Sequence, residues 1–193
     1  LREDRGEIEA ALTETLPSLV TEADLRGDLH SHSDWTDGIH AIDRMAVEAR
    51  RAGYEYLVLT DHTVNLAIAR GLDPDGFAEQ RRVVDALNER SAREEATGAA
   101  PPGTSPEGFR LLHGCELEIR ADGRLDLPDD VLAAFDIVVA SLHVSRRQPR
   151  EQLTARVIDQ SRLPRPSALA ADAIEGAVRQ LDRAFDPRFG GFG

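Results

Sequence analysis

The 193-residue sequence predicts an α/β fold in which a largely parallel sheet is covered by helices. Two observations carry this prediction. Short apolar runs of strand length alternate along the chain with segments whose apolar residues recur every three or four positions. Polar residues of metal-binding type also lie within these runs or directly after them, and in α/β barrels such residues gather where the carboxyl ends of parallel strands meet.

Four segments are predicted as strands. The first contains residues 28–33 (Asp-Leu-His-Ser-His-Ser), and the second covers residues 54–60 and ends in Asp61 and His62. The third covers residues 109–112 and continues into residues 114–119 (Gly-Cys-Glu-Leu-Glu-Ile), and the fourth covers residues 136–142 and is followed by His143. Four of the six histidines therefore lie within or just after predicted strands.

Helices are expected between these strands. Apolar residues at helical spacing begin at Ile42, and Gly53 supplies the stop signal of that helix. Asp73 is a candidate N-cap, because Pro74 follows it at the first helical position and apolar residues continue on one face. A shorter helix is predicted over residues 128–134 and another over residues 149–162. Residues 96–108, rich in Gly, Pro and Ala, are expected to form a flexible surface insertion.

The first strand carries a candidate metal site. In an extended strand, residues two apart point to the same side, so His30 and His32 can reach one ion together. Asp37, next to the turn residue Gly38, can fold back as an oxygen ligand. This donor set suits zinc, manganese or iron. The alternative is that the two histidines are simply solvated or packed.

The motifs together resemble a known family. Asp-Leu-His-Ser-His-Ser, Thr-Asp-Gly, Leu-Thr-Asp-His, Gly-Cys-Glu-Leu-Glu and Ala-Ser-Leu-His are similar to those of the polymerase and histidinol phosphatase (PHP) phosphoesterases, over about residues 24–162. The resemblance implies a distorted TIM-like (β/α) barrel around a cluster of Mn²⁺ or Zn²⁺ ions. Carried over by position, it implies these metal ligands: His30, His32, Asp37, His62, Glu116 and His143.

A subgroup is also indicated. Residues 1–28 resemble the connector that precedes the PHP domain of bacterial family X DNA polymerases, whose PHP domain is a manganese-dependent 3'-5' exonuclease and 3'-phosphatase. This resemblance implies DNA 3' ends as substrate, with the polymerase part absent. Hydrolysis is then expected through a metal-bound hydroxide, with the following residues catalytic: His30, His32, Asp37 and Glu116. Two alternatives are a small-molecule phosphatase of the histidinol phosphatase kind and an inactive truncated remnant.

The sequence departs from the family after Arg162, because no histidine follows and the later ligands of the family are missing. We therefore expect a connector (1–23), the N-terminal part of a PHP domain (24–163) and a C-terminal helical tail (164–193). A complete barrel needs about 250 residues, so the barrel is expected to be incomplete. In the tail, a helical stripe from Leu169 to Phe185 precedes a glycine-rich end. The tail is similar to a segment of thioredoxin-like proteins with an appended helical domain, and a plain amphipathic helix is the alternative.

Composition favours a cytoplasmic protein. No apolar run approaches the length of a membrane helix, the N-terminus lacks a signal-peptide pattern, and the single cysteine excludes an internal disulfide. We expect that cysteine, Cys115, to serve packing. The net charge of -12 argues against a stand-alone nucleic-acid binder. In the polymerase the missing part would hold the DNA.

We also predict the roles of four polar residues that are not candidate metal ligands. His40 and His113 match no ligand position and are expected to be structural or exposed. Asp61 is expected to accept a hydrogen bond from a neighbouring imidazole and so orient it. Glu118 is expected on the opposite strand face to Glu116, or behind the ligands as a supporting residue.

Overall fold

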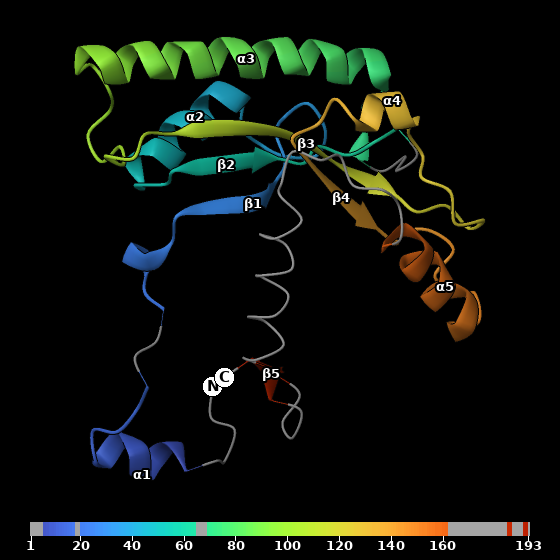
Figure 1. Cartoon of the computed structure of the whole chain (residues 1–193), viewed down its shortest axis with the longest axis horizontal. Helices are drawn as coiled ribbons and strands as arrows, with labels where there is room; N and C mark the ends of the chain where they lie inside the picture. Colours follow the sequence, from blue (N-terminus) through green and yellow to red (C-terminus); the bar gives the residue numbers. More distant parts are fainter. Residues whose placement is uncertain (1–5, 18–19, 65–68, 162–184, 187–190, 193) are drawn as a thin grey trace.

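The computed structural model describes residues 6–17, 20–64, 69–161, 185–186 and 191–192. Four parallel strands form one sheet in the order β1-β2-β3-β4. They are β1 (Gly27–Ser31), β2 (Tyr56–Leu59), β3 (Arg110–Glu118) and β4 (Ile137–Ser141). Each strand lies beside the next one along the chain, and the sheet curls as it proceeds from β1 to β4 (Figure 1). The α/β class is confirmed, and a curled half-barrel is consistent with an incomplete TIM-like barrel.

Helices connect the strands as expected for parallel neighbours. They are α2 (Ile42–Arg51), α3 (Pro74–Thr97) and α4 (Asp129–Leu132), and α5 (Arg150–Ser161) follows β4. The predicted start of α3 is confirmed, because the Asp73 side chain accepts a hydrogen bond from the backbone N–H of Gly76 at 2.8 Å. The stop signal at Gly53 is also confirmed, since it has a φ of 81° directly after α2. The expected insertion begins later than predicted, because α3 continues through Thr97.

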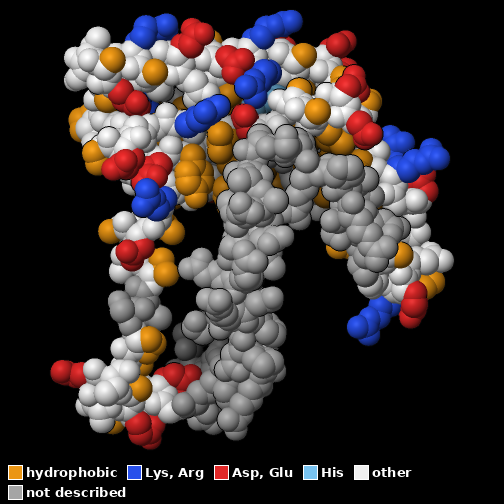
Figure 2. Space-filling model, in the orientation of Figure 1, with side chains coloured by type: hydrophobic (Ala, Val, Ile, Leu, Met, Phe, Trp, Pro, Cys, Tyr) orange, Lys and Arg blue, Asp and Glu red, His pale blue; other side chains and the backbone are white. Residues whose placement is uncertain are grey.

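The core lies between the sheet and the helices α2 and α3. Leu59 and Leu111 on the strands pack with Val84 of α3 and Ile42 of α2 in one hydrophobic cluster, and all four are almost fully buried. Each such side chain contributes about 1.5–3 kcal/mol to stability. The solvent side of α3 shows acidic and basic side chains mixed together (Figure 2). Within α3, Arg81 forms an ion pair with Asp85 at 3.0 Å.

Strand β3 carries apolar side chains on one side and acidic side chains on the other. Its first residues pair with β2 and residues 114–118 pair with β4. Alternate side chains point to opposite sides, so Cys115 and Leu117 enter a second hydrophobic cluster with Phe77 of α3. Cys115 is fully buried, and burial raises the pKa of its thiol, as expected for a residue that serves packing. Glu116 and Glu118 point to the other side of the strand.

Two further segments flank this body. The short helix α1 (Glu7–Leu12) has no buried residue, and a 3₁₀ turn (Glu22–Asp24) precedes β1. The predicted tail helix lies outside the described residues, except that Phe185 is not helical: β5 (Phe185–Asp186) pairs antiparallel with β6 (Gly191–Phe192). The helical stripe was therefore wrong at Phe185, where an extended backbone is held by pairing with Phe192. Among the described helices, none is long and apolar enough to cross a membrane.

Candidate metal centre

The six side chains singled out in the sequence lie together at the carboxyl ends of the four strands. His30 lies in β1 and Glu116 in β3, and Asp37 lies in the loop after β1. The other three, His32, His62 and His143, follow the ends of β1, β2 and β4 by one to three residues. Within three groups, one nitrogen or oxygen atom from each residue lies within 4.8 Å of the others: His30, His32 and Glu116; His32, Asp37 and His62; His62, Glu116 and His143. The groups overlap, so the side chains form one continuous cluster.

Strand pairing explains why the middle of the cluster is well positioned. An isolated parallel bridge joins His62 to Glu116, three residues beyond the end of β2. The backbone N–H of Glu116 donates to the carbonyl of Asp61 at 3.0 Å, and the N–H of Thr63 donates back to the carbonyl of Glu116 at 3.2 Å. These bonds extend the ladder between β2 and β3 and fix both side chains on the same side of the sheet.

Glu116 is the centre of the cluster and is nearly buried. Its Oε2 lies 3.2 Å from Nε2 of His30 and 3.3 Å from Nδ1 of His62, and its Oε1 lies 3.3 Å from Nε2 of His143. Ser141 donates a hydrogen bond to Oε1 at 2.5 Å. Burial raises the pKa of the carboxyl, but the hydrogen bonds from Ser141 and His30 outweigh it, so the pKa lies below its usual value. The carboxylate is therefore ionised at neutral pH.

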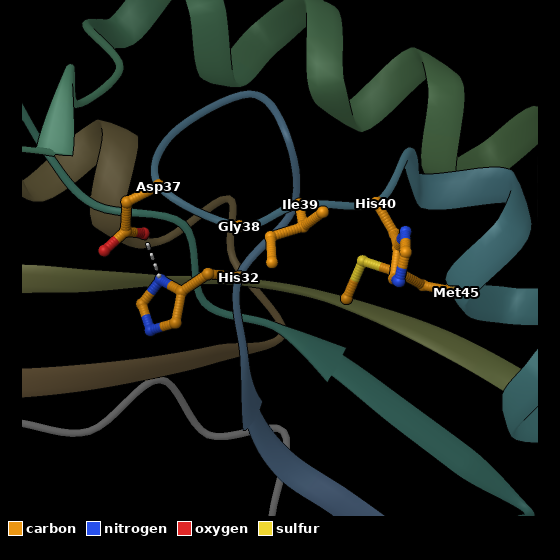
Figure 3. A pocket seen from close by; sticks show the side chains of 6 residues that line it. All are labelled: His32, Asp37, Gly38, Ile39, His40 and Met45. Carbon is orange, nitrogen blue, oxygen red and sulfur yellow. Dashed lines mark ion pairs between the residues drawn. The ribbon is translucent and has the colours of Figure 1, made fainter.

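Asp37 reaches the cluster from the loop between β1 and α2. Its Oδ1 lies 3.5 Å from Nδ1 of His32 (Figure 3), and its Oδ2 lies 3.5 Å from Nε2 of His62. Its side chain is 47% exposed, whereas that of His62 is 8% exposed. Asp37 thus closes the cluster on its solvent side.

The donor set and spacing fit divalent metal ions. Two donors that each lie about 2.1 Å from one ion are about 3.0–3.4 Å apart in octahedral or tetrahedral geometry. Nε2 of His30 lies 3.1 Å from Nε2 of His32 and 3.2 Å from Oε2 of Glu116, both within this range. The buried Nδ1 atoms of His32 and His62 have no hydrogen-bond partner among the described residues. Burial and the neighbouring His32 lower the pKa of His62, which favours the neutral form that binds metals.

Glu118 supports His143 from behind. Its Oε2 accepts hydrogen bonds from the backbone N–H of His143 at 2.9 Å and from Nδ1 of the ring at 3.0 Å. In the neutral tautomer that carries its proton on Nδ1, the other ring nitrogen, Nε2, faces Glu116 and is available as a metal ligand. The expectation of an opposite strand face was wrong, because residues 116 and 118 share one face; the supporting position behind His143 is what the geometry gives. The Glu-x-Glu spacing within one predicted strand could have indicated that the two carboxylates share a face.

Asp61 does not orient an imidazole, so that expectation was wrong. The reason is strand alternation: Leu57 and Leu59 of β2 face the helices, and Asp61 continues that side while His62 faces the cluster. Asp61 instead accepts hydrogen bonds from the loop that carries Asp37 and from Gln80 of α3.

The two remaining histidines lie outside the cluster, in line with the sequence expectation. His113 is buried beside Phe77 and Phe135, with Nε2 at 3.2 Å from Oε1 of Gln80. His40 lines a surface hollow of about 420 Å³ (Figure 3). The hollow adjoins the cluster because it is also lined by His32, Asp37, Gly38, Ile39 and Met45. Ile39 is 87% exposed, which leaves an apolar side chain in solvent beside the candidate metal ligands.

Parts of the chain are similar in sequence to known proteins. Over 139 residues, or 72% of the chain, the sequence is 39% identical to the DNA polymerase/3'-5' exonuclease PolX of Bacillus subtilis. Over 37 residues, or 19% of the chain, it is 51% identical to a probable phosphatase of Clostridium novyi. Both relatives are named for cleavage of phosphate esters. The matched regions cover 22% and 15% of these relatives, so the chain corresponds to a small part of each. No family model matches the chain.

Proposed function

We propose that the chain is a PHP-type, metal-dependent phosphoesterase that hydrolyses DNA 3' ends, as the 3'-5' exonuclease and 3'-phosphatase module of a family X DNA polymerase. One observation carries the proposal: four neighbouring parallel strands bring together four imidazoles and two carboxylates in three overlapping groups of metal-binding geometry. The similarity over 139 residues to a polymerase with 3'-5' exonuclease activity in its name supports the choice of substrate.

In this proposal the cluster holds Mn²⁺ or Zn²⁺ through His30, His32, Asp37, His62, Glu116 and His143. Bound divalent ions lower the pKa of a coordinated water and offset the charge of the phosphate oxygens. Glu116 belongs to two of the three groups and so is suited to span two ions. Glu118 keeps the proton of His143 on Nδ1 and leaves Nε2 as the ligand atom. The chain itself therefore supplies the negative charge of two carboxylates, the orientation of the His143 ligand and a partly buried site.

The surroundings of the cluster suggest how an ester would lie. The hollow next to His32 and Asp37 offers Ile39 and Met45 to an apolar ring, such as the terminal nucleobase. Arg146 and Arg147 are exposed and follow His143 by three and four residues in the chain, so their guanidinium groups are candidates for contact with a substrate phosphate. In this proposal, the hollow offers an apolar surface to the nucleobase, and the two arginines after His143 offer positive charge to the phosphate.

A small-molecule phosphatase is the second candidate. The 51% identity to a probable phosphatase favours it, although the match covers only 37 residues. The two candidates differ in what they need beside the ions. A nucleic-acid exonuclease must hold a chain of phosphates, whereas a phosphatase needs only one phosphate and its organic group.

The test combines metal analysis with two substrates. Purified protein is analysed for bound metal per chain, and the same sample is assayed on a 3'-labelled oligonucleotide and on sugar or amino-alcohol phosphates, each with Mn²⁺ or with a chelator. The oligonucleotide assay is run at low salt, because the chain carries a net charge of -12. Bound metal with Mn²⁺-dependent nucleotide release supports the exonuclease, and phosphate release from the small esters alone supports the phosphatase. A chain without metal or hydrolysis is an inactive remnant and overturns both.

A further inference from the structure

The buried carboxylate of Asp61 lies outside the cluster of candidate ligands but forms hydrogen bonds to the loop that carries Asp37. The Asp61 side chain is 0% exposed, and four donors surround its two oxygens. Oδ1 accepts from the backbone N–H of Ser33 at 2.7 Å and from Oγ1 of Thr36 at 2.6 Å. Oδ2 accepts from Oγ of Ser33 at 2.5 Å and from Nε2 of Gln80 at 2.6 Å. A buried carboxylate with this many short bonds fixes the relative positions of all the groups that donate to it.

Three of these hydrogen-bonded residues are sequence neighbours of one group of candidate ligands. Ser33 follows His32, Thr36 precedes Asp37, and Asp61 precedes His62. The three residues His32, Asp37 and His62 form one of the three metal-binding groups. Asp37 belongs to this group alone, whereas His32 and His62 are shared with the other two. Each member of the group His32, Asp37 and His62 is therefore one peptide bond away from a residue in the buried hydrogen-bond network of Asp61.

The network is anchored on the helix layer. Gln80 of α3 donates to Asp61, and its Oε1 lies 3.2 Å from Nε2 of His113, which packs against Phe135. The loop is closed on itself as well, since the N–H groups of Thr36 and Gly38 both donate to the carbonyl of Ser33. Asp61 thus connects the loop that carries Asp37 to Gln80 of α3.

We propose that Asp61 is a positioning residue that holds the Asp37 loop, and that it thereby sets the affinity of the His32, Asp37 and His62 group for a divalent ion without setting that of the other two groups. The inference rests on the proposed metal centre. His30, Glu116 and His143 are placed independently of the Asp61 side chain by β1, β3 and the Glu118 contact. His62 keeps its bridge to Glu116, so loss of the Asp61 carboxylate releases Asp37 first.

The Asp61→Asn variant tests the proposal with little change in volume. Each oxygen of Asp61 accepts from two donors, and the NH2 group of Asn, in place of either oxygen, can accept from neither. Changes to residues that support metal ligands cost about 10- to 100-fold in affinity. We expect a loss of this size at one ion in a calorimetric titration of metal-free protein with Mn²⁺ or Zn²⁺, with the affinity of the remaining ions unchanged.

Two further variants keep the result interpretable. Thr36→Val removes one of the four donors and keeps the side-chain volume, so a smaller loss at the same ion is expected even where Asp61→Asn fails to fold. Asn88→Ala is the matched control, because Asn88 makes two hydrogen bonds to the backbone of Leu111 away from the cluster. It should lower the unfolding temperature and leave every metal affinity unchanged.

Failure of the positioning role and failure of the proposed metal centre would give different results. Equal weakening of all ions, or no weakening in Asp61→Asn and Thr36→Val, overturns the positioning role while leaving the proposed function intact. A wild-type chain that takes up no ion overturns the metal centre itself, and the positioning role with it.

Discussion

The carboxylate of Glu118 joins His143 to the helix α5. Its Oε2 lies 3.0 Å from Nδ1 of His143, and its Oε1 lies 3.6 Å from a guanidinium nitrogen of Arg156. Both Glu118 and Arg156 are buried, and Arg156 also donates to the carbonyl of Ile119. The only helix after β4 in the described chain is therefore attached to the residue that orients a candidate ligand.

Glu118→Gln is expected to affect both metal binding and stability. The amide is a weaker acceptor for the Nδ1 proton, so metal affinity should fall about 10- to 100-fold. Arg156 would keep its charge in a buried position without a carboxylate, which should cost about 3–5 kcal/mol. Calorimetric metal titration and urea unfolding measure the two effects. Asp122→Asn, which breaks an exposed pair with Arg124, is the control and should change neither. Unaltered metal affinity in Glu118→Gln would contradict its role behind His143.

Glu116→Gln is expected to abolish metal-dependent hydrolysis while leaving the helical circular dichroism signal nearly unchanged. The variant keeps the shape of the side chain but removes the negative charge from the centre of the cluster. Hydrolysis of the 3'-labelled oligonucleotide with Mn²⁺ is the measurement, and Glu48→Gln on the exposed side of α2 is the matched control. Turnover at the wild-type rate would refute the assignment of Glu116 as a ligand.

Gly38→Ala should displace the Asp37 loop. A Cβ atom at Gly38 would lie 2.1 Å from the carbonyl oxygen of His32, so the backbone must move. We expect weaker metal binding and lower activity with a modest loss of stability. Gly76→Ala is the control, because its Cβ would meet only side chains at 3.3 Å or more in the first turn of α3. If metal titration gives the same affinities for both variants, the loop is not held as closely as the contact implies.

Stability should fall on acidification through His113. Burial, with a smaller effect of Arg81, lowers the pKa of His113 to about 4, whereas in the unfolded chain the imidazole has its ordinary pKa of 6.5. Above pH 6.5 both states are neutral. Between pH 6.5 and about 4 only the unfolded state binds the proton, so the free energy of unfolding decreases by about 1.4 kcal/mol per pH unit, or about 3 kcal/mol in all. Urea unfolding of metal-free protein against pH measures this, and His113→Gln should show a shallower dependence. Equal slopes for the two proteins would exclude His113 as the cause.

Ile39→Ser should discriminate between substrates. Because Ile39 is exposed, the change should have little effect on stability, but it removes apolar surface from the hollow beside His32. We expect a higher KM for the oligonucleotide and an unchanged KM for a small phosphate ester that does not reach the hollow. Ile8→Ser, at an exposed position of α1, is the control. A rise in KM for both substrates would show that the hollow does not hold a base.

Local signals in the sequence predicted the framework well. The start of α3 was predicted because an N-cap aspartate and a proline act within one turn, and β2, β3 and β4 were predicted because their apolar runs are short and bounded by polar residues. The proximity of the six candidate ligands could be expected because parallel strands deliver their ends to one edge. Their role as ligands stays a prediction.

The roles of supporting residues were harder to predict. Asp61 was assigned to an imidazole because it adjoins His62, whereas its real partners depend on which side of the sheet it continues and on Gln80 of a helix that follows later. Glu118 was given the wrong face as one option because its partner, His143, is 25 residues away and no local pattern records that contact. The extended pairing at Phe185 likewise depends on Phe192, not on the apolar stripe before it.

The alternation of β3 makes this strand unusually sensitive to changes in chain length. One residue inserted within β3, between its pairing with β2 and Cys115, would turn Glu116 and Glu118 toward Phe77 and carry Cys115 and Leu117 to the cluster side. A single insertion would then bury two carboxylates in an apolar core and remove the central carboxylate of the candidate site at once. The same insertion in the turn region of residues 99–108 would meet no such requirement. Length variation among natural relatives should therefore accumulate before β3 and be absent within it.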